Sequence, residues 1–391
     1  MNPTSASPRL LSLDAFRGFI MLLMASSAFG VAEMAALHPG TFWEVIRPQF
    51  EHRAWQGCAL WDLIQPSFMF MVGIAVPYSC WKRRENGQGM LGMTWHAFTR
   101  SVLLILLAVI LATKSKDTMT TWIFTNVLAQ IGLGYLFLFL IANLGWEYMI
   151  AGIIAILGGY TAFFVLHPLP SPEQIAAIQG MKGTEGAILD GWFSHWSIHL
   201  NAAADFDRWF LNLLPQAQPF EYNPGGYQTL NFIPALATML GGAMTGHFLM
   251  RSPLEPKSKA ARLIIAGVLL LFVGTILGLF AIPVVKRIWT PSWALFSGGW
   301  VLLMLAFFYW LVEIANCRRI VFPLVVVGMN SITIYLLHSW LGGWIRDNLH
   351  KHLPAAWFPP DYAPLIDRCG MLLVLWLVCF WLYRQKAFLK L

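Results

Sequence analysis

Residues 49–68, QFEHRAWQGCALWDLIQPSF, place ionisable side chains directly before an apolar segment. His52 and Asp62 flank the start of that segment, and histidine is the side chain best suited to transfer a proton near neutral pH. Asp62 would then orient the imidazole or hold it in one tautomer. In the alternative interpretation, His52 bonds a backbone carbonyl and Asp62 caps a helix, which requires no chemistry. Spacing alone leaves both interpretations open.

Other polar residues also interrupt apolar segments, where ionisable groups are costly and are therefore candidates for function. In SLDAFRGF, Asp14 and Arg17 are three residues apart and share a helix face. Arg17 could meet an anionic ligand, but a structural ion pair explains the same spacing. In TLNFIPALATMLGGAMTGH, small residues recur every three or four positions, which favours close helix packing. Asn231, near the start of that segment, is the exception to this apolar row.

The stretch GMNSITIYLLH carries a polar stripe on an otherwise apolar span. Ser331, Tyr335 and His338 recur at helical spacing, and Asn330 lies beside them. Such a stripe either bonds a neighbouring helix or lines a cavity. Neither interpretation is preferred from the sequence.

The composition is that of a membrane protein. The 391 residues are 58% hydrophobic and only 12% charged, whereas soluble domains are about a quarter charged. The net charge of +7 follows from the distribution of Lys and Arg between apolar segments and does not indicate nucleic-acid binding. The five cysteines are isolated, without CxxC or metal-ligand spacing, so no metal site is predicted.

Apolar segments long enough to cross a bilayer run through the whole chain, so we expect one polytopic, all-α transmembrane domain over residues 1–391. Backbone groups in lipid must be paired internally, which selects helices of about 20 residues. The ten predicted spans are 13–32, 58–81, 97–113, 122–143, 147–166, 229–250, 261–283, 292–313, 320–342 and 364–383.

The distribution of Lys and Arg predicts that both termini are cytoplasmic. Arg9 and the tail residues Arg384, Lys386 and Lys390 then lie inside, and His52 lies outside. The long segment 167–228 is also outside and is a candidate lid over the outer mouth. Residues 9–28 are not expected to be a cleaved signal peptide, because Asp14 and Arg17 interrupt the apolar core that such a peptide needs.

Six motifs in one order resemble a known family. They are RLLSLDAFRGFIMLLM, HRAWQGCALWDLIQPSFMFMVG, LATMLGGAMTG, RIWTPSWALFSGGW, GMNSITIYLLH and YRQKAFLKL, and they extend from about residue 9 to 391. Together they resemble the heparan-α-glucosaminide N-acetyltransferase family of transmembrane acyltransferases, in particular its poorly characterised bacterial relatives. The resemblance implies a multi-pass protein of the bacterial inner membrane and suggests a homodimer.

The resemblance also implies a reaction and its residues. Acetyl-CoA on the cytoplasmic side would donate an acetyl group to an amine or hydroxyl of a sugar or glycan on the outer side. The family's catalytic histidine lies in a His-x-x-Trp-x-Gly stretch before Asp-Leu-x-x-Pro-x-Phe, which here matches His52 and Asp62. Trp55, Gln56 and Asn231 are the expected acceptor contacts.

The remaining roles are expectations about the same reaction. His52 would take the acceptor's proton, and Asn330, Ser331 or Ser292 would donate to the oxyanion that forms. An acetyl-His52 intermediate is the rival route. Cations would hold the CoA phosphates, and plain membrane topology is the alternative explanation for their position. The expected contacts of acetyl-CoA are Arg17, Lys82, Arg83, Arg84, Ser292 and His338.

Two departures from the family pattern concern the acceptor side. Ser26 and Ser27 stand where the family usually has an asparagine, and Asn223-Pro224-Gly225-Gly226 replaces an Asp-Pro-Glu-Gly stretch. These departures put the glucosamine acceptor in question more than the acyl transfer. Two rival functions stay open, a transporter of sugars or other small molecules and a non-catalytic membrane binding protein.

Overall fold

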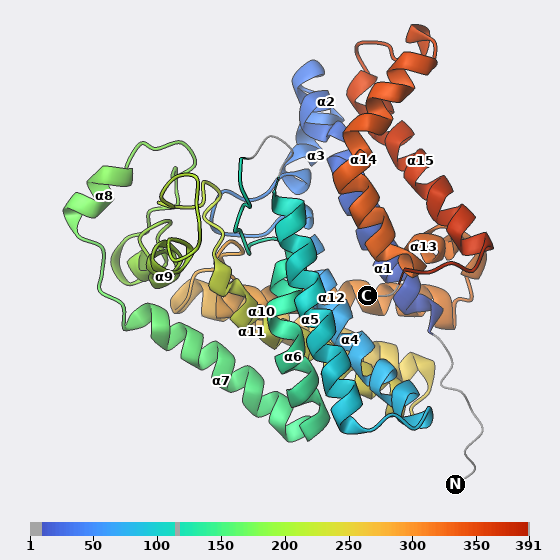
Figure 1. The fold of residues 1–391 in the computed structure, drawn as a ribbon, viewed down its shortest axis with the longest axis horizontal. Coiled ribbons are helices and arrows are strands. Elements are labelled where there is room, and N and C mark those ends of the chain that lie inside the picture. The colour runs from blue at the N-terminus through green and yellow to red at the C-terminus, as the bar shows by residue number, and fades with distance from the viewer. Residues whose placement is uncertain (1–9, 114–117, 390–391) are drawn as a thin grey trace.

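The predicted all-α architecture is confirmed. The structure is a computed structural model that describes residues 10–113 and 118–389, and its regular structure there is helical apart from an isolated bridge between Gln56 and Val285. Arg9 and Lys390, which entered the orientation argument, lie outside the described residues. Figure 1 shows the helices gathered into a bundle.

Eight helical spans within the described ranges are long and apolar enough to cross a membrane. They correspond to eight of the ten predicted segments. Their bounds are α4 Ile64–Glu85 with its 3-10 turn η2 Leu60–Leu63, α5 Met90–Ala112, α6 Val127–Leu144, α7 Trp146–Val165, α10 Phe232–Arg251 with η4 Thr229–Asn231, α11 Pro256–Phe280, α12 Pro291–Tyr309 with the π turn η5 Trp310–Ile314, and α15 Ala363–Arg384.

The other two predicted spans, 13–32 and 320–342, are bent helix pairs, so the count reaches ten only if each pair is one span. In the first, α1 Leu11–Ala25 is followed by η1 Ser27–Gly30 and α2 Val31–Leu37, with a bend of 47°. The bend arises because Ser27, Ala28, Phe29 and Gly30 all have left-handed φ angles. In the second, α13 Arg318–Met329 and α14 Ser331–His352 meet at 70° at Asn330.

Glycines let pairs of these helices approach closely. A Cβ built on Gly18 of α1 would overlap the carbonyl of Leu324 in α13, and one on Gly328 would overlap the carbonyl of Asp14. The same holds between α4 and α10, where Gly242 lies against the carbonyl of Phe70. The close packing predicted for the small-residue row of 229–247 is thereby confirmed.

Shorter helices make up the segments expected outside. They are α3 Phe42–Phe50, α8 Pro172–Ile178, η3 Gly191–Trp196, α9 Ala202–Leu211 and η6 Ala355–Trp357. Figure 1 shows α8 and α9 at one edge of the bundle beyond α7, and α2 and α3 near the hairpin of α14 and α15. A core cluster that includes Trp55, Trp196 and Val285 joins the α8–α9 segment to the segments around residues 55 and 285.

Candidate functional site

The segment between α3 and α4 is folded around the carboxylate of Asp62. Asp62 Oδ2 accepts hydrogen bonds from the backbone N–H groups of Ala59, at 3.1 Å, and Arg53, at 3.2 Å. The first of these bonds caps η2, since Asp62 is at the third position of that turn. The capping role considered for Asp62 is therefore present.

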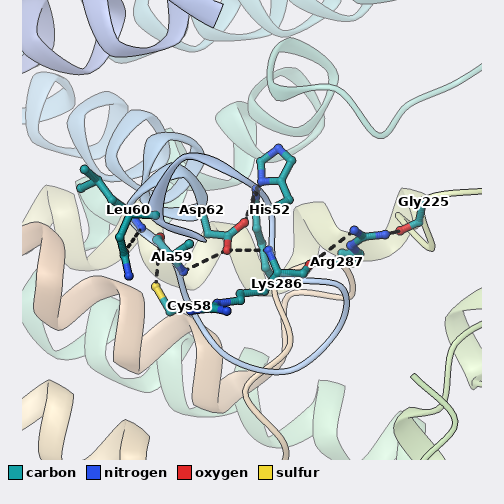
Figure 2. Close-up of polar contacts among 10 residues, drawn as sticks. His52, Cys58, Ala59, Leu60, Asp62, Gly225, Lys286 and Arg287 are labelled. Atoms are coloured by element: carbon teal, nitrogen blue, oxygen red, sulfur yellow. Dashed lines mark hydrogen bonds and ion pairs between the residues drawn. The ribbon is translucent and has the colours of Figure 1, made fainter. Parts of the chain in front are cut away.

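The same carboxylate also contacts His52, as the orienting interpretation requires. His52 Nδ1 lies 2.7 Å from Asp62 Oδ1 (Figure 2). The Asp62 side chain is 1% exposed, whereas the His52 side chain is 41% exposed. With Nδ1 occupied, Nε2 is the ring nitrogen left for an incoming molecule, so capping and orientation are two uses of one side chain.

A lysine that sequence reasoning missed completes this cluster. Lys286 Nζ lies 3.2 Å from Asp62 Oδ1 and 3.0 Å from His52 Nδ1, and its side chain is 7% exposed. A buried charge is tolerated when it is paired, and here Lys286 and Asp62 compensate each other. Figure 2 shows the three side chains converging from the segment 52–62 and from the loop between α11 and α12.

Backbone contacts fix the loop that carries Lys286. Gly57 N donates to the carbonyl of Val284 at 2.9 Å, next to the bridge between Gln56 and Val285. Arg287 donates to the carbonyls of Gly225, at 2.6 Å, and Arg53, at 3.3 Å. Three segments far apart in the sequence therefore meet at His52.

The signal for Lys286 in the sequence is weak. The pair Lys286-Arg287 follows Val284-Val285 between two spans, on the side that was predicted to be outer. A loop charge explains that position without any partner. Only the folded contacts distinguish Lys286, which is buried at the carboxylate, from Arg287, which bonds backbone carbonyls.

The three expected acceptor contacts have different surroundings. Trp55 is 2% exposed, and its Nε1 donates to the carbonyl of Trp196 at 3.0 Å, so it connects the segment 167–228 to the His52 segment. Gln56 is exposed beside the bridge to Val285. Asn231 is buried and donates to the carbonyl of Arg287 at 2.8 Å.

A hollow of about 510 Å³ opens beside His52. It is largely polar, and both acids and bases line it, so it suits a hydroxylated or charged molecule rather than a lipid tail. Its lining residues are Glu44, Arg47, Pro48, Glu51, His52, Arg53 and Ala54.

A second cavity, of about 490 Å³, lies at the other ends of α4 and α10. Its walls are mostly apolar, and Arg84, His247 and Arg251 supply the cationic or ionisable groups. A 22-residue helix is about 33 Å long, roughly the thickness of a bilayer core, and this cavity lies along the half of α4 that is far from His52.

Among the other cations expected at this end, Arg83 donates to Gln88 Oε1 and Arg84 to Asn143 Oδ1, both at 2.8 Å. Lys82 is exposed on the same last turn of α4. Arg17 lies 3.7 Å from Asp14, as the structural alternative predicted.

Within the described residues, no hydrogen bond or ion pair joins the other predicted contacts to the His52–Asp62–Lys286 cluster. Ser292 is fully buried and donates to the carbonyl of Pro283 at 2.8 Å, so its hydroxyl is used in the turn before α12. His338 Nε2 bonds Ser27 Oγ at 2.9 Å, which joins the two bent spans. Asn330 and Ser331 lie at the bend between α13 and α14. Asn330 is 1% exposed, and neither polar atom of its side chain has a partner among the described residues.

Cys58 is the nucleophilic side chain nearest to Asp62 in the sequence, and its surroundings keep it protonated. Burial and the neighbouring carboxylate of Asp62 raise the pKa of the Cys58 thiol to about 12. Because the thiolate is the reactive form, Cys58 is unsuited to carry an acyl group near neutral pH.

The fold and these contacts define a class: a multi-pass helical membrane protein with a histidine–carboxylate pair at one end of its bundle. Residues 9–182 match the family model "Heparan-alpha-glucosaminide N-acetyltransferase, catalytic". The heparan-alpha-glucosaminide N-acetyltransferases of Homo sapiens and Mus musculus are each 30% identical to the chain, over 104 and 107 residues. The resemblance indicated by the motifs is thus confirmed over residues 9–182, where the chain is similar to this acyltransferase family.

The aligned part is 27% of this chain and 14% of each of the two curated relatives. The family match includes His52, Asp62 and Arg84, whereas Lys286 and Asn330 lie beyond residue 182. The similarity therefore supports acyltransferase chemistry, and the donor and the acceptor require separate arguments.

Proposed function

We propose that this chain is a membrane-embedded acetyltransferase that moves an acetyl group from cytoplasmic acetyl-CoA to an amine or hydroxyl of a sugar or glycan on the outer side. The observation that carries the proposal is the 2.7 Å contact between His52 Nδ1 and the buried carboxylate of Asp62. This contact leaves Nε2 for the outer hollow, where an acceptor can enter.

The chemistry requires a base, because a protonated amine cannot attack a thioester. His52 Nε2 takes a proton from the acceptor, and the freed nitrogen or oxygen lone pair forms a bond to the acetyl carbonyl carbon. The carbon–sulfur bond then breaks, and the imidazolium returns the proton to the leaving thiolate of CoA. When the acceptor starts as an ammonium, the second N–H proton lost on amide formation passes to solvent. In the rival route Nε2 itself attacks the thioester, and retention of labelled acetyl on His52 without acceptor would identify that route.

The donor is proposed to enter from the inner cavity. Arg84 and Arg251 offer charge to phosphates, and Trp81 and Trp146 offer apolar faces to the adenine ring. Since this cavity and His52 lie at opposite ends of α4, the pantetheine arm would extend through the bundle toward the outer side. Arg17, Lys82 and Arg83 would add to the positive potential, and the arm would meet Ser292, His338, Asn330 and Ser331 along that path.

The acceptor is proposed to bind in the outer hollow with the segment 167–228 as its cover. Trp55 connects that segment to the catalytic segment through Trp196. Gln56 and Asn231 would help to position the sugar. We propose that the protein is a single transmembrane domain in a bacterial inner membrane, with both termini in the cytoplasm. The family resemblance further suggests that two copies form a homodimer.

Sided vesicles test this proposal. Purified protein is reconstituted, acetyl-labelled acetyl-CoA is supplied on one side only, and amino sugars or glycan fragments are supplied on the other. We expect labelled acceptor to form only when acetyl-CoA faces the Arg84 end of the protein. Absence of label on every acceptor, together with absence of acetyl-CoA binding, would contradict the proposal.

A second candidate is a transporter, and one observation favours it. Two bent spans pack against each other at Gly18 and Gly328, and Asn330 at one bend is buried without a partner among the described residues. Interrupted helices of this kind form substrate sites in many transporters. Sugar flux into the same vesicles without acetyl-CoA, in place of acetyl transfer, would support this candidate.

A further inference from the structure

Two nitrogens meet at one carboxylate oxygen, and the three contacts among these atoms cannot all be hydrogen bonds at once. Asp62 Oδ1 lies 2.7 Å from His52 Nδ1 and 3.2 Å from Lys286 Nζ, and the two nitrogens are 3.0 Å apart. If Nδ1 carries a proton, it donates to Asp62 and Nε2 keeps a lone pair. If Nδ1 instead accepts from Lys286, Nε2 carries the proton and cannot act as a base.

We propose that Lys286 is a positioning residue that keeps His52 uncharged by neutralising Asp62. The proposal rests on the proposed function, in which His52 must be unprotonated to accept a proton. A buried carboxylate next to an imidazole stabilises the imidazolium, whereas an ammonium at the same distance opposes it. With Lys286 paired to Asp62, the carboxylate can orient Nδ1–H without retaining a second proton on the ring.

The burial pattern separates Lys286 from the other charges around His52. The acid and base of α3 that are closest in sequence to His52 pair with each other, since Arg47 Nε lies 2.8 Å from Glu51 Oε1, and both are exposed to solvent screening. Lys286 is 7% exposed and its partner Asp62 is 1% exposed. The ionisable groups that face the cluster, among the described residues, are Glu44 and Arg47 of α3, Glu51, Arg53 and Cys58 of the following segment, Tyr227 after the segment 167–226, and Arg287.

The position of Lys286 also excludes a direct contact with the acceptor. It does not line the outer hollow, and it lies on the Asp62 side of the imidazole, away from Nε2. Its loop is held by the hydrogen bond between Gly57 and Val284, independently of any bound molecule. Lys286 therefore acts through His52 and not on the reacting atoms.

The test measures proton binding to His52 without any turnover. Purified protein in detergent, labelled at histidine Cε1, is titrated by NMR, and His52→Gln identifies the His52 signal by its loss. We compare the wild type with Lys286→Met, Lys286→Gln and the charge-retaining Lys286→Arg. Arg287→Met serves as the matched control, because it removes a neighbouring cation that does not contact Asp62.

We expect the midpoint for His52 to rise by about one pH unit or more in Lys286→Met and Lys286→Gln, and to stay near the wild-type value in Lys286→Arg and Arg287→Met. The acidic limb of the pH–rate profile for acetyl transfer should rise by the same amount, and activity should recover at higher pH. A role in folding alone would lower activity equally at every pH.

An unchanged or lower midpoint in both neutral variants would overturn the inference. Lys286→Gln keeps a hydrogen-bond donor, so it serves if Lys286→Met does not fold. The NMR result is independent of the proposed reaction. If the midpoints shift but the protein transfers no acetyl group, the proposed acetyltransferase function is wrong and the role of Lys286 in His52 protonation stands. If the midpoints do not shift in a protein that transfers acetyl groups, the function stands and the role of Lys286 is wrong.

Discussion

His52 can offer only one ring nitrogen to the outer hollow, because the other is held between Asp62 and Lys286. This asymmetry is a property of single residues, since two side chains and two backbone N–H groups converge on the carboxylate of Asp62. Asp62 consequently has two functions, the closure of the 53–62 segment and the orientation of His52, and both depend on the same carboxylate.

Replacement of Asp62 by asparagine should therefore damage both stability and activity. The amide would leave Lys286 as a buried charge without its partner, and breaking such a pair costs about 3–5 kcal/mol. Thermal unfolding in detergent should show a lower midpoint for Asp62→Asn. The double variant Lys286→Met, Asp62→Asn removes both charges and should recover part of the lost thermal stability. Equal loss in the single and the double variant would show that the ion pair is not the cause.

A second titratable residue lies in the outer loop. Asp207 is 1% exposed, and burial raises its pKa from 3.8 to about 6. A raised carboxyl pKa means that the folded state binds the proton more tightly. Proton binding by Asp207 therefore stabilises the folded state fully below about pH 4, and this stabilisation is lost as the pH rises to about 6. The total effect on the free energy of unfolding is roughly 3 kcal/mol.

Asp207→Asn should remove this dependence, so the variant should gain stability relative to the wild type as the pH rises from about 4 to 6. His199 acts in the opposite sense in both proteins, because burial lowers its pKa from 6.5 to about 4 and protonation of the unfolded chain costs stability as the pH falls. Thermal unfolding of the two proteins across this range measures the difference. A difference that does not vary with pH would contradict the assignment to Asp207.

The elements are held in register by close helix crossings that glycine permits. α1 and α13 touch backbone to backbone at Gly18 and Gly328, so even a methyl group has no room there. This crossing lies between the bent first and ninth spans, which His338 and Ser27 also join. Each of these two bent spans is therefore held in place by its contacts with the other.

Alanine at Gly18 or Gly328 should separate α1 from α13 and destabilise the protein by about 1–3 kcal/mol. Gly158→Ala is the matched control, because nothing lies within 4 Å of a Cβ built at that helical glycine, and alanine there should be neutral or slightly stabilising. Detergent thermal unfolding compares the three variants. Equal midpoints for Gly18→Ala and Gly158→Ala would exclude a tight crossing.

At the level of elements, the sequence predicted what depends on local pattern. Ten apolar segments were sufficient to predict a helical membrane protein, and the row of small residues around Gly242 predicted a close crossing. The bend at 27–30 was not predicted, because Ser27, Ala28 and Phe29 have no unusual preference for left-handed φ. Lys286 was missed for a different reason. Its partner Asp62 is 224 residues away, and no spacing rule connects two such positions.

Across the whole molecule, a hollow at His52 and a cavity at Arg84 lie toward opposite ends of α4, and the orientation of the protein decides which one faces the cytoplasm. The proposed orientation requires the Arg84 end inside and the hairpin between α14 and α15 outside. Cysteine labelling in intact cells tests it on a variant that lacks the five natural cysteines.

A membrane-impermeant maleimide should label His352→Cys in intact cells and Asn86→Cys only after permeabilisation, since both positions are exposed at opposite ends of the protein. The reverse pattern would place the His52 hollow in the cytoplasm. The proposed passage of an acetyl group to an outer acceptor would then be wrong, whereas acyl transfer itself would remain open.

The central claim is acyl transfer that depends on His52. The most direct measurement is release of free CoA and labelling of the acceptor by purified protein in detergent, with wild type beside His52→Gln, acetyl-CoA as donor, and a panel of amino sugars and glycan fragments. We predict that one class of acceptor is acetylated and that His52→Gln lowers its rate by about 10²–10⁴-fold with acetyl-CoA binding unchanged. Equal turnover by the two proteins, or binding of acetyl-CoA by neither, would contradict the account.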